Sequence, residues 1–90
     1  MLSMFVYMLK DSTNKIYVGI SKNPSQRLSE HASKRGAVLT KKFINPEIVF
    51  LEEHNSYEDA AKREIQIKKW RREKKELLIR KYQKGLETKI

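Results

Sequence analysis

The sequence predicts a small α+β domain in which helices cover a three-stranded antiparallel sheet, in the order β-β-α-β-α-α. Three observations lead to this class. Two short β-favouring segments lie close together near the N-terminus, a clear helix start follows them, and two helical patterns come after a third apolar segment. With 90 residues, 39% of them hydrophobic, the chain has enough apolar material for one thin core. We therefore expect a single domain over residues 1–85.

The first two strands form a predicted hairpin. Residues 4–9 (MFVYML) favour a strand, KDSTN supplies turn residues, and residues 15–20 (KIYVGI) read as the returning strand. Tyr7 and Tyr17 share a face in any antiparallel register whose paired positions sum to an even number, and they lie nearly opposite if that sum is 24. The third strand is EIVFLEEH (47–54), whose apolar interior indicates burial on both faces or a pairing edge.

The first helix is predicted to run from residue 24 to residue 33 or 34. Asn23 is a suitable N-cap, Pro24 suits the first helical position, and Gln26 lies where a capping-box partner belongs. Gly36 is the expected stop signal.

Two helical patterns follow the third strand. Ser56 is the predicted cap of YEDAAKREIQIKKW, whose expected core-facing residues are Tyr57, Ala60, Ala61 and Ile65, with Trp70 as a further candidate. RREKKELLIRKYQKG has Leu77, Leu78 and Tyr82 as its apolar side and Gly85 as its stop, and residues 86–90 should fray. The periodicity leaves open whether the two patterns form one helix or break near residues 71–73.

The charge of the chain favours an anionic partner. Twenty basic residues against eleven acidic ones give a net charge of +9, which attracts phosphate backbones but also suits an anionic membrane surface or ribosomal RNA. The chain contains no cysteine, which excludes disulfides and thiolate zinc sites. Its N-terminal apolar segment is too short to span a bilayer and lacks export features, so we expect a cytoplasmic protein without a membrane partner.

A few polar residues lie where packing alone does not require them. Arg27 and His31 are one helical turn apart, and Glu64 follows two alanines that allow a helix to approach the sheet closely. Together with the two phenols, they form a candidate site. Gly19 indicates a close approach to the backbone, either by substrate or by the first helix.

The segments FVY, YVG, RLSEH and AAKREIQIKKWRREKKELL, which extend from Phe5 to about Ile79, resemble the GIY-YIG nuclease family. The chain looks most like the small stand-alone bacterial members, which are related to the N-terminal nuclease domain of excinuclease C. The resemblance implies the GIY-YIG fold and a metal-dependent DNA endonuclease that hydrolyses phosphodiester bonds, with a role in repair or recombination.

The resemblance also implies catalytic roles for five residues. Glu64 would hold one divalent cation, Mg²⁺ or Mn²⁺, and Arg27 would grip the scissile phosphate. Tyr7 would take a proton from water, His31 would relay it, and Tyr17 would orient water or phosphate. A free phenol has a pKa of about 10, so Tyr7 needs cationic neighbours to act as a base.

Further basic residues are predicted to hold DNA without reading its sequence, which favours a shape- or structure-selective substrate. They are Lys41 and Lys42 on the middle loop, and Lys68, Lys69, Arg71 and Arg72 around Trp70. Trp70 can either stack on a base or be buried in the core. A small domain of this kind would bind weakly by itself or borrow affinity from a protein partner.

Simpler interpretations remain open. Residues 65–90 contain no asparagine, whereas several family nucleases carry one there, so a non-catalytic nucleic-acid-binding module on the same fold is an alternative. A third alternative is a basic interaction protein that uses its C-terminal helices. The phenols would then be ordinary strand residues, and Glu64 would form an i,i+4 ion pair with Lys68.

Overall fold

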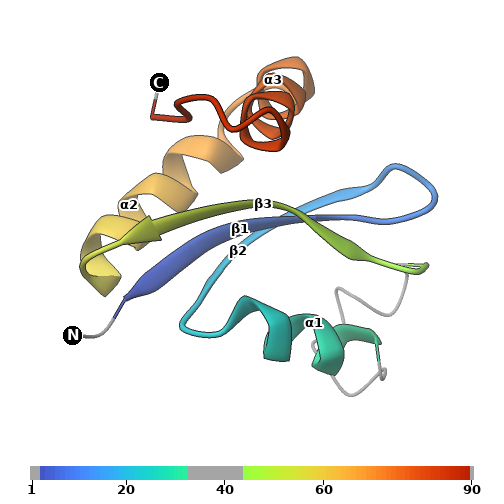
Figure 1. The fold of residues 1–90 in the computed structure, drawn as a ribbon, viewed down its shortest axis with the longest axis horizontal. Helices are drawn as coiled ribbons and strands as arrows, with labels where there is room; N and C mark the ends of the chain where they lie inside the picture. The colour runs from blue at the N-terminus through green and yellow to red at the C-terminus, as the bar shows by residue number, and fades with distance from the viewer. Residues whose placement is uncertain (1–2, 33–43, 90) are drawn as a thin grey trace.

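The computed structural model of the chain describes residues 3–32 and 44–89. Its elements are β1 (Met4–Lys10), β2 (Ile16–Ser21), α1 (Pro24–Ala32), β3 (Glu47–His54), α2 (Tyr57–Lys68) and α3 (Arg72–Gln83) (Figure 1). The sheet order is β2-β1-β3, and both strand pairs are antiparallel. The predicted α+β class, sheet and element order are confirmed, while the predicted helix stop at Gly36 lies outside the described residues.

Asp11 organises the hairpin turn. Its Oδ1 accepts hydrogen bonds from the Thr13 amide, the Thr13 hydroxyl and the Lys15 amide at 3.0, 2.7 and 2.9 Å, while Asn14 has the left-handed φ of 68°. Its Oδ2 accepts from the Ile44 amide at 3.0 Å, which fixes the segment before β3 to the hairpin. Burial alone would raise the pKa of Asp11, but these hydrogen bonds outweigh it and lower the pKa to about 2.

The hairpin register places Tyr7 opposite Gly19 and Tyr17 opposite Leu9. The two phenols therefore share a face, as predicted for an even sum, but the sum of the paired positions is 26 rather than the 24 that would place them nearly opposite each other. The last paired position is Lys10 with Ile16, because the hydrogen bonds of Asp11 hold the five residues between them in the turn.

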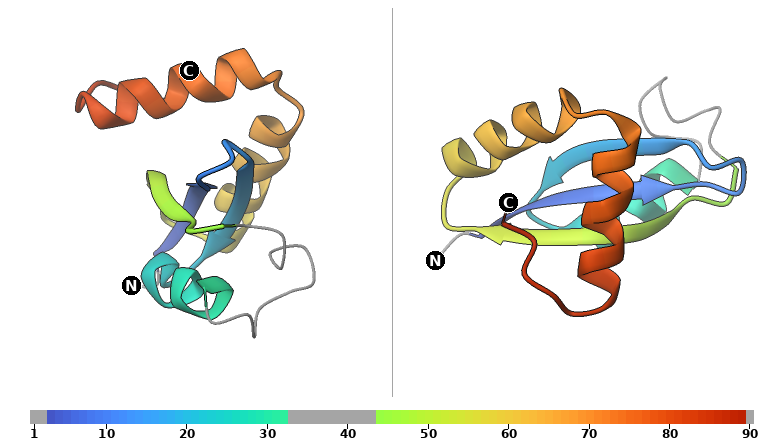
Figure 2. Two further views of the ribbon diagram at one scale, coloured as in Figure 1. Left: turned by 90° about the vertical axis from the view of Figure 1, so that its right-hand side faces the viewer. Right: turned by 90° about the horizontal axis from the view of Figure 1, so that it is seen from above.

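The two faces of the sheet have different neighbours. The main core lies on one face and combines Met4, Val6, Met8, Val18 and Phe50 of the strands with Ala60 and Ile67 of α2 and Leu78 and Ile79 of α3. By the alternation of a strand, Tyr7 and Leu9 point to the opposite face, where both are almost fully buried. Figures 1 and 2 show α1 on that side of the sheet and α3 on the other.

The N-terminal ends of two helices are capped as predicted. Asn23 Oδ1 accepts a hydrogen bond from the Gln26 amide at 3.2 Å, and the Ser56 hydroxyl accepts from the Asp59 amide at 3.1 Å. The amide of Asn23 donates to the Ser21 hydroxyl at 3.0 Å. Ser21 thus takes the reciprocal role that the capping box would have given to Gln26.

The buried face of α2 differs from the predicted one. Ala60, Arg63 and Ile67 are buried, whereas Tyr57 and Ile65, expected in the core, are 60% and 54% exposed. The helix is rotated because Arg63, which no apolar pattern places inside, pairs with a carboxylate under the helix. The rotation leaves two large apolar side chains on the surface.

The C-terminal helical patterns form two helices that are separated at residues 69–71. Trp70 at this break is partly buried against the core, with Lys74 Nζ at 4.2 Å and Arg63 Cζ at 5.2 Å from its ring centroid. In α3, Leu78 and Ile79 are buried, whereas Leu77, expected on the apolar side, is 39% exposed.

The C-terminal tail is anchored by a buried ion pair. Arg63 Nε donates a hydrogen bond to Glu52 Oε1 at 2.9 Å. The Thr88 hydroxyl donates to Glu52 Oε2 at 3.0 Å, and the Thr88 carbonyl accepts a hydrogen bond from Arg63 at 2.8 Å. Burial alone would raise the pKa of Glu52, but hydrogen bonds from Arg63 and His54 lower it. Helix α3 ends before Gly85, which has φ 72° as predicted for a stop signal. The segment expected to fray thus has a fixed residue in Thr88.

Candidate active site

The structure pairs the phenols of Tyr7 and Tyr17 above Gly19. The two ring centroids are 6.1 Å apart, and the ring planes are tilted by 46°. A Cβ atom on Gly19 would lie 2.8 Å from the Tyr7 hydroxyl and 2.9 Å from Cε2 of Tyr17, which is closer than real Cβ atoms approach. The close approach that the sequence predicted at Gly19 is therefore made by the phenols, rather than by α1 or a substrate.

Helix α1 adds a cation to this pair. The pKa of Tyr7 is raised to about 12, first by burial and then by the neighbouring Tyr17, while a hydrogen bond with Arg27 and the positive charge of Arg27 act in the opposite direction. The effect of Arg27 thus has the predicted sign but is smaller than that of burial. Near neutral pH, Tyr7 is a neutral phenol in contact with a guanidinium group.

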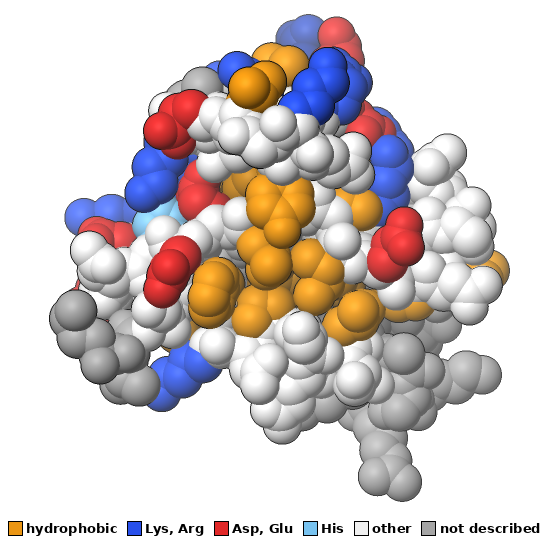
Figure 3. All heavy atoms as spheres, in the orientation of Figure 1, with side chains coloured by type: hydrophobic (Ala, Val, Ile, Leu, Met, Phe, Trp, Pro, Cys, Tyr) orange, Lys and Arg blue, Asp and Glu red, His pale blue; other side chains and the backbone are white. Residues whose placement is uncertain are grey.

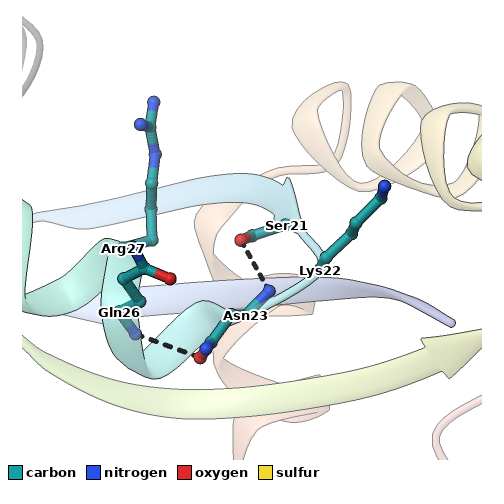
Figure 4. Close-up of a pocket in the computed structure, with 5 residues that line it drawn as sticks. All are labelled: Ser21, Lys22, Asn23, Gln26 and Arg27. Carbon is teal, nitrogen blue, oxygen red and sulfur yellow. Dashed lines mark hydrogen bonds between the residues drawn. The ribbon is translucent and has the colours of Figure 1, made fainter. Parts of the chain in front are cut away.

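A polar pocket of about 240 Å³ lies at the junction of β2 and α1. It is lined by Ser21, Lys22, Asn23, Gln26 and Arg27. In Figure 4 the long side chains of Lys22 and Arg27 extend to the same side. Lys22 and Arg27 thus place two positive charges at one small polar pocket, next to the phenol of Tyr7. This arrangement suits a phosphate group.

Lys22 was not identified from the sequence. The signal that could have found it is its position between the end of a strand and the first turn of a helix, five residues before Arg27. Exposed lysines are common, however, and only the pocket distinguishes Lys22 from the others.

The geometry of α2 places Glu64 on the flank that faces the β2 edge of the sheet. Each residue advances a helix by about 100°, so Arg63 and Glu64 lie on opposite sides of the line through Ala60 and Ile67. Arg63 reaches Glu52 in β3, and β3 and β2 are the opposite edges of the sheet. Figure 2 shows α2 running along the β2 side.

The carboxylate of Glu64 lies 3.2 Å from Lys68 Nζ, and its side chain is 19% exposed. Helix α2 packs on the face of the sheet opposite to Tyr7, so Glu64 can reach the polar pocket only around the β2 edge. The structure thus brings Tyr7, Tyr17 and Arg27 together, while the convergence of Glu64 with them stays a prediction.

A single carboxylate is compatible with the hard cation that the sequence predicted. Within residues 3–32 and 44–89, no group of three or more His, Cys, Asp or Glu residues could hold a metal ion. Mg²⁺ usually keeps several waters and binds through one or two carboxylates plus substrate phosphates. Glu64 therefore fits a cation that binds together with the substrate, rather than one held in a closed protein cage.

Three predicted site residues cannot be placed. His31 belongs to α1, but its side chain is outside the described part of the chain, as are Lys41 and Lys42 entirely. Their roles stay predictions.

The basic residues predicted around Trp70 have mixed surroundings. Lys68 is paired with Glu64, and Arg72 lies 3.0 Å from Glu76 Oε2, whereas Lys69 and Arg71 are exposed at the break between α2 and α3. Figure 3 shows Lys and Arg side chains gathered over α3, interleaved with acidic ones. This surface is cationic on balance, and its contact with DNA stays a prediction.

Comparison with known proteins agrees with the class that the fold and the paired phenols define. A family model described as the GIY-YIG catalytic domain matches residues 3–77, and the chain belongs to this family. UPF0213 proteins from Staphylococcus aureus strains Mu3 and Mu50 are each 36% identical to it over 78 residues, which cover 87% of this chain and 95% of theirs.

A solved structure gives the same result. The solution NMR structure of a UPF0213 protein from Bacillus halodurans is similar with a TM-score of 0.56 and 30% sequence identity, covering 86% of this chain and 82% of that one. The resemblance that the sequence motifs indicated is thereby confirmed, together with the GIY-YIG fold. In the described part of the chain, no helix has the length and apolar character needed to cross a membrane.

Proposed function

We propose that the chain is a metal-dependent DNA endonuclease that hydrolyses phosphodiester bonds with Tyr7, Tyr17, Arg27, His31 and Glu64. The observation that carries the proposal is the buried phenol of Tyr7, which lies against Arg27 beside a polar pocket. Membership of the GIY-YIG family and the net charge of +9 support it. Residues 1–85 would form the catalytic unit.

Arg27 and Lys22 bind the DNA backbone in this proposal. The planar guanidinium of Arg27 grips the scissile phosphate, and Lys22, on the same side of the pocket, neutralises the neighbouring phosphate. The contact of Arg27 with Tyr7 then places the phenol next to the phosphate that Arg27 holds. Tyr17 packs against Tyr7 and orients water or phosphate.

Tyr7 is the proton acceptor of this site, assisted by His31. Its raised pKa means that the phenol first orients the attacking water as a neutral group. It must lose its own proton, by way of His31, before the phenolate can accept a proton from water, and extra positive charge nearby favours that ionisation. Arg27 supplies part of that charge. A divalent cation held by Glu64, Mg²⁺ or Mn²⁺, would neutralise the phosphoryl oxygens and favour ionisation of nearby water.

Glu64 must change partners before it can bind a cation. Its ion pair with Lys68, whose side chain is 53% exposed, is an i,i+4 helix pair of the kind worth only about 0.3–0.5 kcal/mol, so exchange is easy. The exchange frees the Lys68 ammonium for a phosphate of the same substrate. Cation binding and DNA binding would then support each other.

The decisive experiment is nicking of supercoiled plasmid and branched DNA with Mg²⁺ or Mn²⁺. We expect Arg27→Ala and Glu64→Gln to lower the cleavage rate by roughly 10²–10³-fold, because each removes a group that stabilises charge in the transition state. Glu58→Gln, which alters an exposed carboxylate on the same helix, is the matched control and should cut at the parental rate. Parental nicking by the Glu64 variant would contradict the assignment.

A non-catalytic nucleic-acid-binding module on the same fold is the second candidate. The neutral state of Tyr7 and the Glu64–Lys68 pair favour it, because a neutral phenol is not a base and the carboxylate already has a cationic partner. It predicts salt-dependent binding, with log K falling by about 0.9 per phosphate contact on duplex DNA, and no metal-dependent product.

The setting of the activity is also part of the proposal. We place it in the cytoplasm, in DNA repair or recombination, on substrates recognised by shape rather than by sequence. A protein partner would add affinity that a domain of this size lacks.

A further inference from the structure

Helix α2 carries an exposed apolar stripe, defined here by Tyr57, Ala61 and Ile65. These positions are four residues apart, so they lie along one side of the helix. Tyr57 is 60% exposed and Ile65 is 54% exposed, although the opposite side of the same helix is buried in the core. Folding therefore does not account for these two side chains.

The stripe borders the candidate metal ligand. Tyr57 and Glu64 are seven residues apart and so lie close to one line along the helix, while Ile65 is one turn before Lys68. Because Glu64 lies on the flank that faces the β2 edge, Tyr57 lies on that flank as well. The stripe and the carboxylate thus belong to one surface.

The sheet register brings the stripe to the same end of the molecule as the phosphate-binding pocket. Ser21, just before Lys22, pairs with Phe5, and His54, three residues before Tyr57, pairs with the adjacent Met4. The starts of α1 and α2 therefore lie at one end of the sheet. A polynucleotide chain that passes Lys22 and Arg27 can continue along the β2 edge to Tyr57.

We propose that Tyr57 stacks on an unpaired base near the scissile phosphate and that Ile65 packs against a nucleotide further along the strand, so that the site selects DNA with unpaired bases. This inference rests on the proposed function. An exposed aromatic ring among cations is the combination that binds single strands, because the ring accepts any base face while the cations hold the backbone. Here Lys68 lies near the same line of α2 as Tyr57, about three turns further on, and Lys22 lies at the same end of the sheet as Tyr57.

Charge complementarity favours a polynucleotide over a second copy of the chain. Two copies would each bring a charge of +9 to the interface, and the flank supplies only Glu58 and Glu64 as opposite charges. A nucleic acid strand offers apolar base faces and phosphates at once. In an intact duplex the base faces are stacked on each other, so Tyr57 would find a partner only where pairing is broken.

Equilibrium binding of labelled oligonucleotides in EDTA tests the proposal without any need for cleavage. We expect Tyr57→Ala to bind a single strand or a flap about tenfold more weakly, which is the usual loss for one stacked base, and to bind an intact duplex as the parent does. Tyr57→Phe keeps the ring and should bind as the parent does, whereas Tyr57→Leu keeps apolar volume without a ring and should behave like Tyr57→Ala.

Leu86→Ala is the matched control, because Leu86 is 55% exposed and lies beyond α3; it should bind all substrates like the parent. Urea unfolding of each variant checks that the fold is intact. Equal loss of single-strand and duplex binding in Tyr57→Ala, or no loss at all, would overturn the proposal. So would a shift from dimer to monomer in sedimentation with unchanged binding, which would assign the stripe to a second copy of the chain.

The outcome is separable from the proposed function. Selective loss of unpaired-base binding supports the stacking role even if Glu64→Gln shows that the chain does not cleave. Conversely, unchanged binding by Tyr57→Ala alongside Mg²⁺-dependent nicking refutes the stacking role and leaves the nuclease in place.

Discussion

The hydroxyl of Tyr7 occupies the space that a side chain on Gly19 would need. The two residues are direct partners in the β1–β2 ladder, and a Cβ on Gly19 would approach both phenols to within 2.9 Å. The glycine of the hairpin is thus explained by the phenols of the candidate site rather than by a turn.

Substituting Gly19 by alanine should displace Tyr7 and Tyr17 together. We expect Gly19→Ala to lower the free energy of unfolding by about 1–3 kcal/mol, which is typical of overpacking, and to abolish nicking. Urea unfolding and plasmid nicking measure the two effects. Gly85→Ala is the control: it has nothing within 4 Å of its Cβ but a φ of +72°, so it should cost roughly 1–2 kcal/mol and leave nicking intact.

The ionisation of Tyr7 should weaken the fold at high pH. Because the pKa of Tyr7 is raised to about 12 in the folded chain from about 10 in the unfolded chain, its contribution to stability is complete below pH 10 and is lost as the pH rises toward 12. Denaturant unfolding at successive pH values should show this loss in the parent. The slope should be smaller in Tyr7→Phe, and an unchanged slope would contradict the burial of this phenol.

Replacing only one partner of the Glu52–Arg63 ion pair should strongly lower the free energy of unfolding. Their side chains are 3% and 9% exposed, so Arg63→Met leaves a buried carboxylate without its main partner and should lower the free energy of unfolding by about 3–5 kcal/mol. Adding Glu52→Leu to that variant should recover part of the loss. Urea unfolding of the parent, the single variants and the double variant completes the cycle.

Asp11 should stabilise the turn only while it is ionised. Its pKa is lowered to about 2 in the fold against about 3.9 for an unperturbed aspartate, so its contribution is present above pH 4 and disappears as the pH falls to 2. We expect Asp11→Asn to be less stable at pH 7 and to show a flatter acid limb in thermal melts. Parallel acid limbs in variant and parent would argue against the hydrogen bonds at this turn.

Local sequence signals were sufficient for most of the architecture. The hairpin, the Asn23 and Ser56 caps and the Gly85 stop depend on residues within a few positions of each other, and all of them are confirmed. The shared face of Tyr7 and Tyr17 follows from strand alternation alone. The exact register does not, because it depends on how many residues the side chain of Asp11 holds in the turn.

The predictions from sequence were wrong where a contact joins segments that are distant along the chain. Tyr57 and Ile65 were expected inside because they are apolar, but the rotation of α2 is set by Arg63, whose burial requires Glu52 on another strand. Thr88 is fixed by the same pair. Within the candidate site, the motifs identified Tyr7, Tyr17 and Arg27, which the structure brings together, whereas Lys22 required knowledge of the pocket.

The one-sided core has a consequence for how such proteins diversify. The contacts that hold α2 and α3 lie on the far side of β1 from the phenols, so substitutions of exposed pocket residues such as Lys22 and Gln26 remove little of the packing on which folding depends. Related proteins can therefore differ in the residues that contact substrate while they keep the same fold. Arg63 limits such variation in α2, because a different rotation of the helix would leave the buried carboxylate of Glu52 without its ion-pair partner.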